Sequence, residues 1–325
     1  MLINYSMLRR QPEHPIYPHR RIGSRATLAR MLQCSVSDLE ATASAADGLY
    51  NEIKTRKKDG SIRLCYDAKP LLKGMQARIK CLILRHVKYP SYLMGGLLDP
   101  ELPRDFVRNA SAHTGARVLI NEDLADFFPS ISVPIISDVF RHFFGFPKDV
   151  ARTLTRLTTR MGCLPQGAKT STYLSNLVFW AHEPQLVAVL WSMGFEYTRY
   201  IDDVTISSKS DKTCRELGRA LSLLSSMVTR YGLKFKRPKH RLIYAGQRME
   251  VTGLVIGEDG VGLSHEKQSA IRELVRECEI NARRNIPTEI GSTARKRVAS
   301  LVGLYARLHP VPGQALRARL RAVFP

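Results

Sequence analysis

Residues 195–207 read FEYTRYIDDVTIS, and this stretch decides the fold. Aromatic and β-branched residues on both sides of an acidic pair predict two short strands joined by a tight turn. The pair, Asp202 and Asp203, places two carboxylates at the tip of a hairpin, where they repel each other unless a cation lies between them. Carboxylate oxygens suit Mg²⁺, which takes one or two carboxylates together with substrate phosphates. An isolated Asp-Asp pair is more often a polar turn, so the metal interpretation depends on the sequence upstream.

A second acidic stretch lies at residues 118–130, VLINEDLADFFPS. Its apolar run predicts a buried strand that ends at Asp123, and Pro129 prevents that strand from continuing. Asp123 and Asp202 are 79 residues apart, which leaves room for a helical crossover that brings both strands into one sheet. Carboxylates that meet in this way can hold two cations about 4 Å apart, the arrangement that activates the attacking oxygen and stabilises the leaving one in phosphoryl transfer.

Charge is the unusual feature of the composition. The 325 residues include 50 Lys and Arg against 29 Asp and Glu, a formal net charge of +21. This excess indicates a polyanionic partner, nucleic acid before membrane, because no basic amphipathic anchor stands out. The six cysteines have no zinc spacing and are typical of reduced thiols. With no signal peptide and no apolar run near the roughly 20 residues that span a membrane, we expect a cytoplasmic protein.

Five motifs together resemble those of a known family. The two acidic stretches resemble motifs A and C of a reverse transcriptase, and residues 164–176, LPQGAKTSTYLSN, resemble its motif B. Residues 109–113, NASAH, resemble the Asn-Ala-x-x-His motif of retron reverse transcriptases, and residues 251–253 resemble their Val-Thr-Gly motif. Because the motifs follow the family's order over roughly residues 55–255, the chain is identified as a member of the retron-type reverse transcriptases.

The resemblance implies an α+β right-hand polymerase. We expect an N-terminal arm and helical extension (1–48), a fingers and palm domain (49–250) and an RNA-binding thumb (251–325). The palm is expected to be an antiparallel sheet with helices on its back face. The helix that begins in motif B is expected to run to about residue 190, and residues 133–160 are expected to be helical.

The resemblance also assigns the metal site. Asp123, Asp202 and Asp203 are expected to hold two Mg²⁺ ions, for which Mn²⁺ can substitute, with the backbone carbonyl of Leu124 as a further ligand. Glu122 departs from the family pattern, and the sequence leaves open whether it perturbs metal affinity or faces solvent.

Further residues are expected to contact the incoming nucleotide. Arg63 matches the family's triphosphate contact, Phe128 its steric gate beneath the sugar, and Lys239 a general acid or charge stabiliser at the leaving pyrophosphate. Asp126 and Gln166 complete this nucleotide-binding set, whereas Phe127 is expected in the core.

A last set is expected to contact RNA, through the retron motifs and a basic helical face. The residues are Asn109, His113, Val251, Thr252, Gly253, Arg276, Arg283 and Arg284.

The implied reaction is RNA-templated DNA synthesis from dNTPs. By resemblance, synthesis starts at the 2′-OH of a guanosine in the cognate noncoding RNA (msr-msd) and yields branched multicopy single-stranded DNA (msDNA), in antiphage defence with a separate effector protein. Two alternatives stay open: a reverse transcriptase of another branch, group II intron-like or diversity-generating, and a catalytically inactive RNA-binding scaffold. The retron motifs disfavour the first alternative, and the three intact aspartates disfavour the second.

Overall fold

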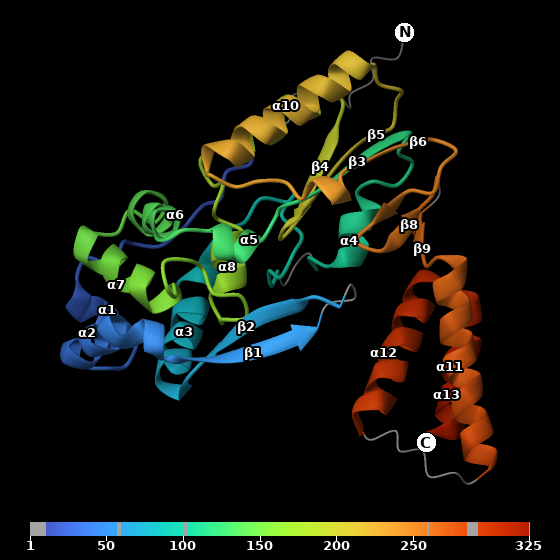
Figure 1. Ribbon diagram of the computed structural model, residues 1–325, viewed down its shortest axis with the longest axis horizontal. Helices are drawn as coiled ribbons and strands as arrows, with labels where there is room; N and C mark the ends of the chain where they lie inside the picture. Colours follow the sequence, from blue (N-terminus) through green and yellow to red (C-terminus); the bar gives the residue numbers. More distant parts are fainter. Residues whose placement is uncertain (1–10, 57–59, 100–102, 259, 285–291, 325) are drawn as a thin grey trace.

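The computed structural model describes residues 11–56, 60–99, 103–258, 260–284 and 292–324. In these residues helices are mixed with three sheets, of two, four and three strands, in which all the paired strands are antiparallel (Figure 1). The α+β prediction is therefore confirmed. No helix in the described ranges is long and apolar enough to cross a membrane.

The four-stranded sheet lies at the centre of the molecule. Its strands, in the order β4-β5-β3-β6, are β4 (Glu196–Tyr200), β5 (Asp203–Ser208), β3 (Val118–Asp123) and β6 (Arg241–Tyr244). The hairpin predicted from residues 195–207 is β4 and β5, and β3 is the predicted strand that ends at Asp123. Because side chains alternate along a strand, β3 has two buried faces, with Ile120 in one core and Leu119 in another.

Helices α9 (Glu183–Ser192) and α10 (Cys214–Arg230) belong to the core on the Ile120 face. The first turn of α10 is fixed by a capping box, in which Thr213 and Glu216 each bond the other's backbone N–H. Leu224 and Val228 of α10 are buried in the same hydrophobic cluster as Ile120. The sheet is thus covered by helices on one face, as predicted.

A second helical region lies at the base of a projecting hairpin (Figure 1). The hairpin strands are β1 (Tyr50–Arg56) and β2 (Ile62–Ala68), and the predicted turn residues 57–59 lie outside the described ranges. The helices are α1 (Arg25–Met31), α2 (Val36–Ala45), α3 (Pro70–Leu82), α5 (Phe127–Ser130), α6 (Val133–Asp138), α7 (Lys148–Thr158) and α8 (Ser171–Ser175).

Of the two helical regions predicted from the sequence, the one that begins in motif B is interrupted. Residues 133–160 form α6, a π-helical turn (Val139–Phe143) and α7, which starts after Pro147. The predicted motif B helix ends at Ser175, and α9 begins anew at Glu183 with Pro184 in its first turn. The break has a physical cause, described below: a buried guanidinium takes the carbonyls at the end of α8.

The C-terminal region has its own core. It comprises β7 (Glu250–Val251), β8 (Leu254–Ile256), β9 (Val261–Gly262), α11 (His265–Arg283), α12 (Ser292–Leu308) and α13 (Pro310–Val323). Val251, Val275 and Leu316 belong to one buried cluster with Leu119 of the central sheet. The short helix α4 (Phe106–Ser111) contributes Val107 and Ala110 to this cluster, so it joins the two regions.

Two glycines give a matched test of how α12 and α13 pack. A Cβ at Gly313 would lie 2.7 Å from the Cβ of Ala306 and still closer to its Cα, whereas a Cβ at Gly303 meets nothing within 4 Å. We expect Gly313→Ala to lower the free energy of unfolding by about 1–3 kcal/mol through overpacking. Gly303→Ala should raise it by about 0.5–1 kcal/mol, because alanine is the better helix former. Thermal unfolding of both variants measures this, and shifts of the same sign would contradict the packing.

Candidate active site

Three carboxylates meet at one edge of the central sheet. The strand register places Asp123, the last residue of β3, opposite Asp203, the first residue of β5. Ile201 and Asp202 form the turn between β4 and β5, and the backbone N–H of Leu124 donates to the carbonyl of Asp202 at 3.0 Å. The structure therefore brings Asp123, Asp202 and Asp203 together, as the sequence predicted for distant acidic residues.

The electrostatics of this edge favour a bound cation. Burial raises the pKa of Asp202, and the charge of Asp123 raises it further. Burial, together with Asp202 and Asp123, raises the pKa of Asp203 to about 7. The Nζ of Lys239 forms an ion pair with the carboxylate of Asp123. Mutually repelling carboxylates of this kind are relieved by a cation, so the donor chemistry fits Mg²⁺.

The protein alone supplies only part of a metal coordination shell. Among the described residues, no three His, Cys, Asp or Glu side chains are arranged so that they could hold a metal ion. Mg²⁺ usually retains waters and takes substrate phosphates beside one or two carboxylates, so such a partial set agrees with a site completed by the nucleotide.

A buried arginine donates a hydrogen bond to the backbone of the turn that carries Asp202. Arg199 on β4 is fully buried, and its Nε and Nη2 donate to the two carboxylate oxygens of Glu183 at 2.6 and 2.8 Å. The remaining guanidinium protons go to backbone carbonyls: Nη1 bonds Ile201 at 3.1 Å and Ser175 at 3.4 Å, and Nη2 bonds Asn176 at 3.2 Å. All five donors of this buried charge are therefore used, as a stable buried ion pair requires.

The loop at residues 92–96 packs closely against the same turn. Ile201 has φ +62°, a conformation that is rare for a β-branched residue. A Cβ at Gly95 would lie 2.6 Å from Cγ1 of Ile201 and 2.7 Å from its nitrogen, so only glycine fits there. Asn176 closes the contact by donating from Nδ2 to the carbonyl of Gly95 at 3.0 Å. Neighbours on both sides thus fix the strained turn.

Comparison with known proteins agrees with this geometry. The family profile described as reverse transcriptase (RNA-dependent DNA polymerase) matches residues 55–259, which include all three aspartates. The chain is 31% identical to the retron Se72 reverse transcriptase of Salmonella heidelberg over 308 residues, covering 94% of this chain and 80% of that protein. It is 27% identical to the Escherichia coli retron Ec48 reverse transcriptase over 310 residues (92% and 75%) and 30% identical to that of retron Ec86 over 247 residues (75% of each).

The chain belongs to the retron reverse transcriptases. It is an RNA-directed DNA polymerase, and the resemblance drawn from its motifs is confirmed. The remaining predicted site residues of this reverse transcriptase can now be placed.

The residues that follow Asp123 in motif A differ in how far they are buried. Residues 127–130 form the single helical turn α5 rather than a strand, with Phe127 buried and Phe128 partly exposed. The predicted core position of Phe127 is therefore confirmed. Asp126 is exposed, with φ +42°. Phe128 as the steric gate and Asp126 beside the nucleotide stay predictions.

Glu122 adopts neither of the arrangements considered from sequence. It is buried and lies on the face of β3 opposite Asp123, where its Oε1 is 2.6 Å from Nδ1 of His240. It therefore neither faces solvent nor joins the metal carboxylates.

Other nucleotide-site candidates lie around the same edge. Arg63 is exposed on β2, and its charge lowers the pKa of Asp202 against the larger effect of burial. The carbonyl of Gln166 accepts from the backbone N–H of Tyr66 at 2.7 Å, which ties motif B to the β1–β2 hairpin. Lys239 contacts Asp123 directly. These positions agree with a nucleotide bound between the hairpin and the carboxylates.

The two retron motifs contact each other, and Asn109, His113 and Val251 are buried, whereas Thr252 and Gly253 are partly exposed. Asn109 and His113 are each 1% exposed, so direct RNA contact by these side chains does not agree with the structure. The ring nitrogens of His113 lie 2.7 and 2.8 Å from the hydroxyls of Ser207 and Thr198 on the catalytic hairpin. Asn109 Nδ2 donates to Thr252 Oγ1 at 3.5 Å, so the two motifs meet across 143 residues of sequence. They form a joint between the central sheet and the C-terminal region.

The Val-Thr-Gly motif is a tight turn between β7 and β8. Val251 is buried, Thr252 and Gly253 have φ +47° and +80°, and Thr252 Oγ1 donates to the carbonyl of Phe106 at 3.0 Å. RNA contact by the Val251 side chain is therefore not available. Arg307 of α12 strengthens the same joint through a 2.6 Å ion pair with Asp105, the N-cap of α4.

The basic residues predicted to contact RNA lie on the surface of the C-terminal region. Arg276, Arg283 and Arg284 are exposed along and just after α11, and Arg276 has a 3.6 Å ion pair with Glu273. Their RNA contact stays a prediction.

Sequence reasoning missed the Arg199–Glu183 pair. The available signal was a charged residue between aromatic and β-branched residues of a predicted strand, two residues before Ile201 of the turn that carries Asp202. A lone arginine there has no recognisable partner in sequence, because Glu183 lies 16 residues upstream in a helix.

His113 makes stability depend on pH. Burial lowers the pKa of His113 to about 3, below the ordinary value of 6.5, so the folded protein holds the ring neutral where the unfolded chain protonates it. Unfolding therefore takes up a proton below pH 6.5, and the free energy of unfolding falls by about 1.5 kcal/mol between pH 6.5 and 5.0 from this residue alone.

We expect His113→Gln to remove that share of the pH dependence, whatever its stability at pH 6.5. Urea unfolding between pH 5.0 and 6.5 measures the slope, with His142→Gln, at an exposed position, as the control. Equal slopes in His113→Gln and the control would contradict the buried neutral ring.

Proposed function

We propose that this reverse transcriptase copies a structured retron RNA into DNA with two Mg²⁺ ions held by Asp123, Asp202 and Asp203 and by the backbone carbonyl of Leu124. The observation that carries the proposal is the register of β3 against β5, which sets Asp123 opposite Asp203 at the end of a fixed hairpin. Two ions in such a site activate the 3′-hydroxyl and stabilise the leaving pyrophosphate. Mn²⁺ is expected to replace Mg²⁺, because it takes the same oxygen ligands.

The chain's own residues position the other reactants. In this proposal Arg63 binds the triphosphate of the dNTP, and Phe128 excludes a ribose 2′-OH. Gln166 and Asp126 flank the nucleotide. Lys239 is placed to donate a proton from Nζ to the leaving pyrophosphate or to neutralise its charge. The ion pair of Lys239 with Asp123 supports this role.

The architecture follows the right-hand plan in this proposal. The central sheet is the palm, the β1–β2 hairpin and helices α1–α3 belong to the fingers, and α11–α13 form the thumb. Exposed arginines of the thumb, among them Arg276, Arg283 and Arg284, suit the phosphate backbone of a duplex. The joint of the two retron motifs sets the thumb against the catalytic hairpin.

The partners follow from the family. The relatives named above are retron reverse transcriptases, which supports a cognate noncoding RNA (msr-msd) as template and primer, priming from the 2′-OH of a guanosine, and branched msDNA as the product. We place the enzyme in antiphage defence, with a separate effector protein.

Primer extension tests the catalytic assignment. With Mg²⁺ on poly(rA)/oligo(dT), we expect Asp202→Asn to reduce dTTP incorporation at least about 100-fold, because it removes a charge that binds metal in the transition state. Asp211→Asn, the same change at an exposed position, should retain the wild-type rate. Equal incorporation by the two variants, or none by wild type, would contradict the assignment.

The retron assignment has its own test. Nucleic acid purified with the protein from its native host is expected to contain DNA joined to RNA through a 2′,5′ linkage, detected as a debranching-sensitive band. DNA without attached RNA would contradict the proposed priming.

A further inference from the structure

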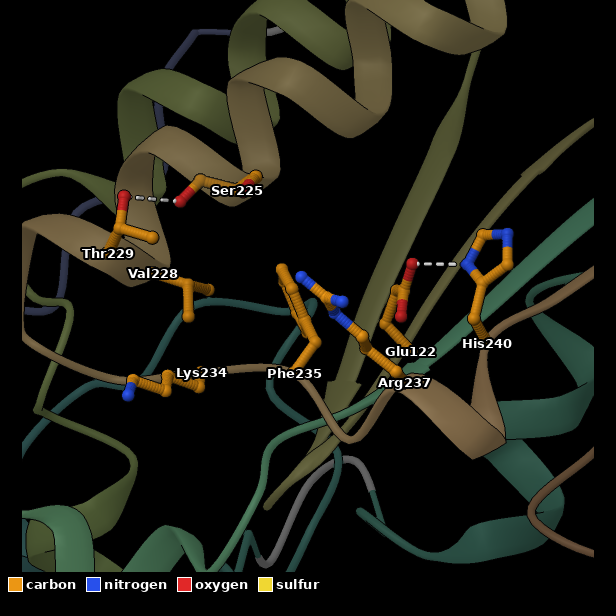
Figure 2. A pocket seen from close by; sticks show the side chains of 8 residues that line it. All are labelled: Glu122, Ser225, Val228, Thr229, Lys234, Phe235, Arg237 and His240. Carbon is orange, nitrogen blue, oxygen red and sulfur yellow. Dashed lines mark hydrogen bonds and ion pairs between the residues drawn. The ribbon is translucent and has the colours of Figure 1, made fainter.

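A cavity of about 510 Å³ lies on the far side of β3 from the catalytic carboxylates. It is bounded by the last turns of α10 and by the segment 234–240, which runs beside the end of β3 (Figure 2). Because successive strand residues face opposite sides, Glu122 lines this cavity while its neighbour Asp123 faces the active site. The lining includes Glu122, Val228, Lys234, Phe235, Arg237 and His240.

Two cations of this lining have no side-chain partner among the described residues. The side chains of Lys234 and Arg237 are exposed, and neither makes a hydrogen bond or ion pair within the described part of the chain. Figure 2 shows the guanidinium of Arg237 extending between Phe235 and Glu122, with Lys234 at the other end of the cavity. Unpaired cations at a concave surface favour a phosphate, which a guanidinium binds with paired donors.

The cavity also offers an aromatic surface. Phe235 is partly buried, packs against the main core and lines the cavity, with the buried side chain of Val228 beside it. An aromatic face beside cations is the arrangement that stacks a nucleobase while its phosphate is held.

A buried acceptor completes the lining. The Glu122 side chain is 6% exposed, and its Oε1 is taken by His240. Its second oxygen makes no hydrogen bond to any described residue and can accept from an amino or hydroxyl group. A bare phosphate has no use for such an acceptor, whereas a nucleotide carries donors on its base and ribose.

We propose that this cavity binds one nucleotide. Its phosphate lies against Arg237 and Lys234, its base stacks on Phe235, and a base amino group or ribose hydroxyl donates to Glu122. The nucleotide is either a residue of the bound RNA, a source that rests on the proposed function, or a free nucleotide. Since the N–H of Lys236 donates to the carbonyl of Asp123 at 2.7 Å and Lys239 contacts its carboxylate, the occupant also steadies the segment that serves the active site.

Calorimetry with 5′-AMP tests the proposal without any catalysis. The full chain, freed of nucleic acid, is titrated in EDTA so that the metal site takes no part. We expect saturable binding with a Kd below about 1 mM, weakened at least about 10-fold, or 1.4 kcal/mol, in the Lys234→Ala/Arg237→Ala variant. The control is Arg215→Ala/Arg219→Ala, which removes the same charge from exposed positions on α10 and should change Kd less than about 2-fold.

Inorganic phosphate should bind at least about 5-fold more weakly than 5′-AMP, because it lacks a base to stack. No saturable 5′-AMP binding, equal Kd values in the two double variants, or equal affinity for phosphate and 5′-AMP would each overturn the proposal.

Ultraviolet cross-linking of the enzyme with its co-purified RNA distinguishes the two sources. An RNA adduct on Phe235 identifies the bound RNA, and undiminished 5′-AMP binding by the RNA complex identifies a free nucleotide. Both outcomes support the cavity, and loss of polymerase activity affects neither readout.

Discussion

The buried ion pair between Arg199 and Glu183 is the interaction on which the arrangement of the β4–β5 turn depends. One guanidinium gathers the end of α8, the start of α9 and the carbonyl of Ile201 in the catalytic turn. Tyr197 adds a hydrogen bond from its hydroxyl to Glu183 at 2.7 Å. Removing one partner of such a pair leaves an uncompensated buried charge, at a cost of about 3–5 kcal/mol, so neither residue can be lost alone without destabilising the fold. The ion pair thus helps to hold the strained turn at Ile201 in one conformation, which fixes the position of the Asp202 carboxylate.

Strand register then decides which acidic residue does what. Asp123 and Glu122 are neighbours, but alternation along β3 sends one to the carboxylate edge and the other to the α10 face. The opposite face of the sheet is joined to the C-terminal region by α4, through His113 and Asn109. The β4–β5 hairpin is therefore in contact, through His113, with the segment that packs on the C-terminal region.

The sequence predicted the structural features that follow from local residue patterns. It did not predict the features that depend on contacts between distant residues. The hairpin at Asp202 follows from aromatic and β-branched residues around a turn, and the strand that delivers Asp123 follows from the apolar run before it. The interruption of the motif B helix could not be predicted from local pattern, because it depends on a guanidinium from a distant strand. The sequence also predicted that Asn109 and His113 contact RNA. A motif identifies residues that are typical of a family, but it does not show whether they are buried.

The central claim is that strand register builds a two-ion site, and Mn²⁺ uptake measures this most directly. In electron paramagnetic resonance titrations with primer-template and a non-hydrolysable dNTP analogue, wild type is predicted to remove two Mn²⁺ ions per chain from solution. Asp123→Asn and Asp203→Asn, altered on the two paired strands, should each remove at most one. Uptake by either variant equal to that of wild type would contradict the account.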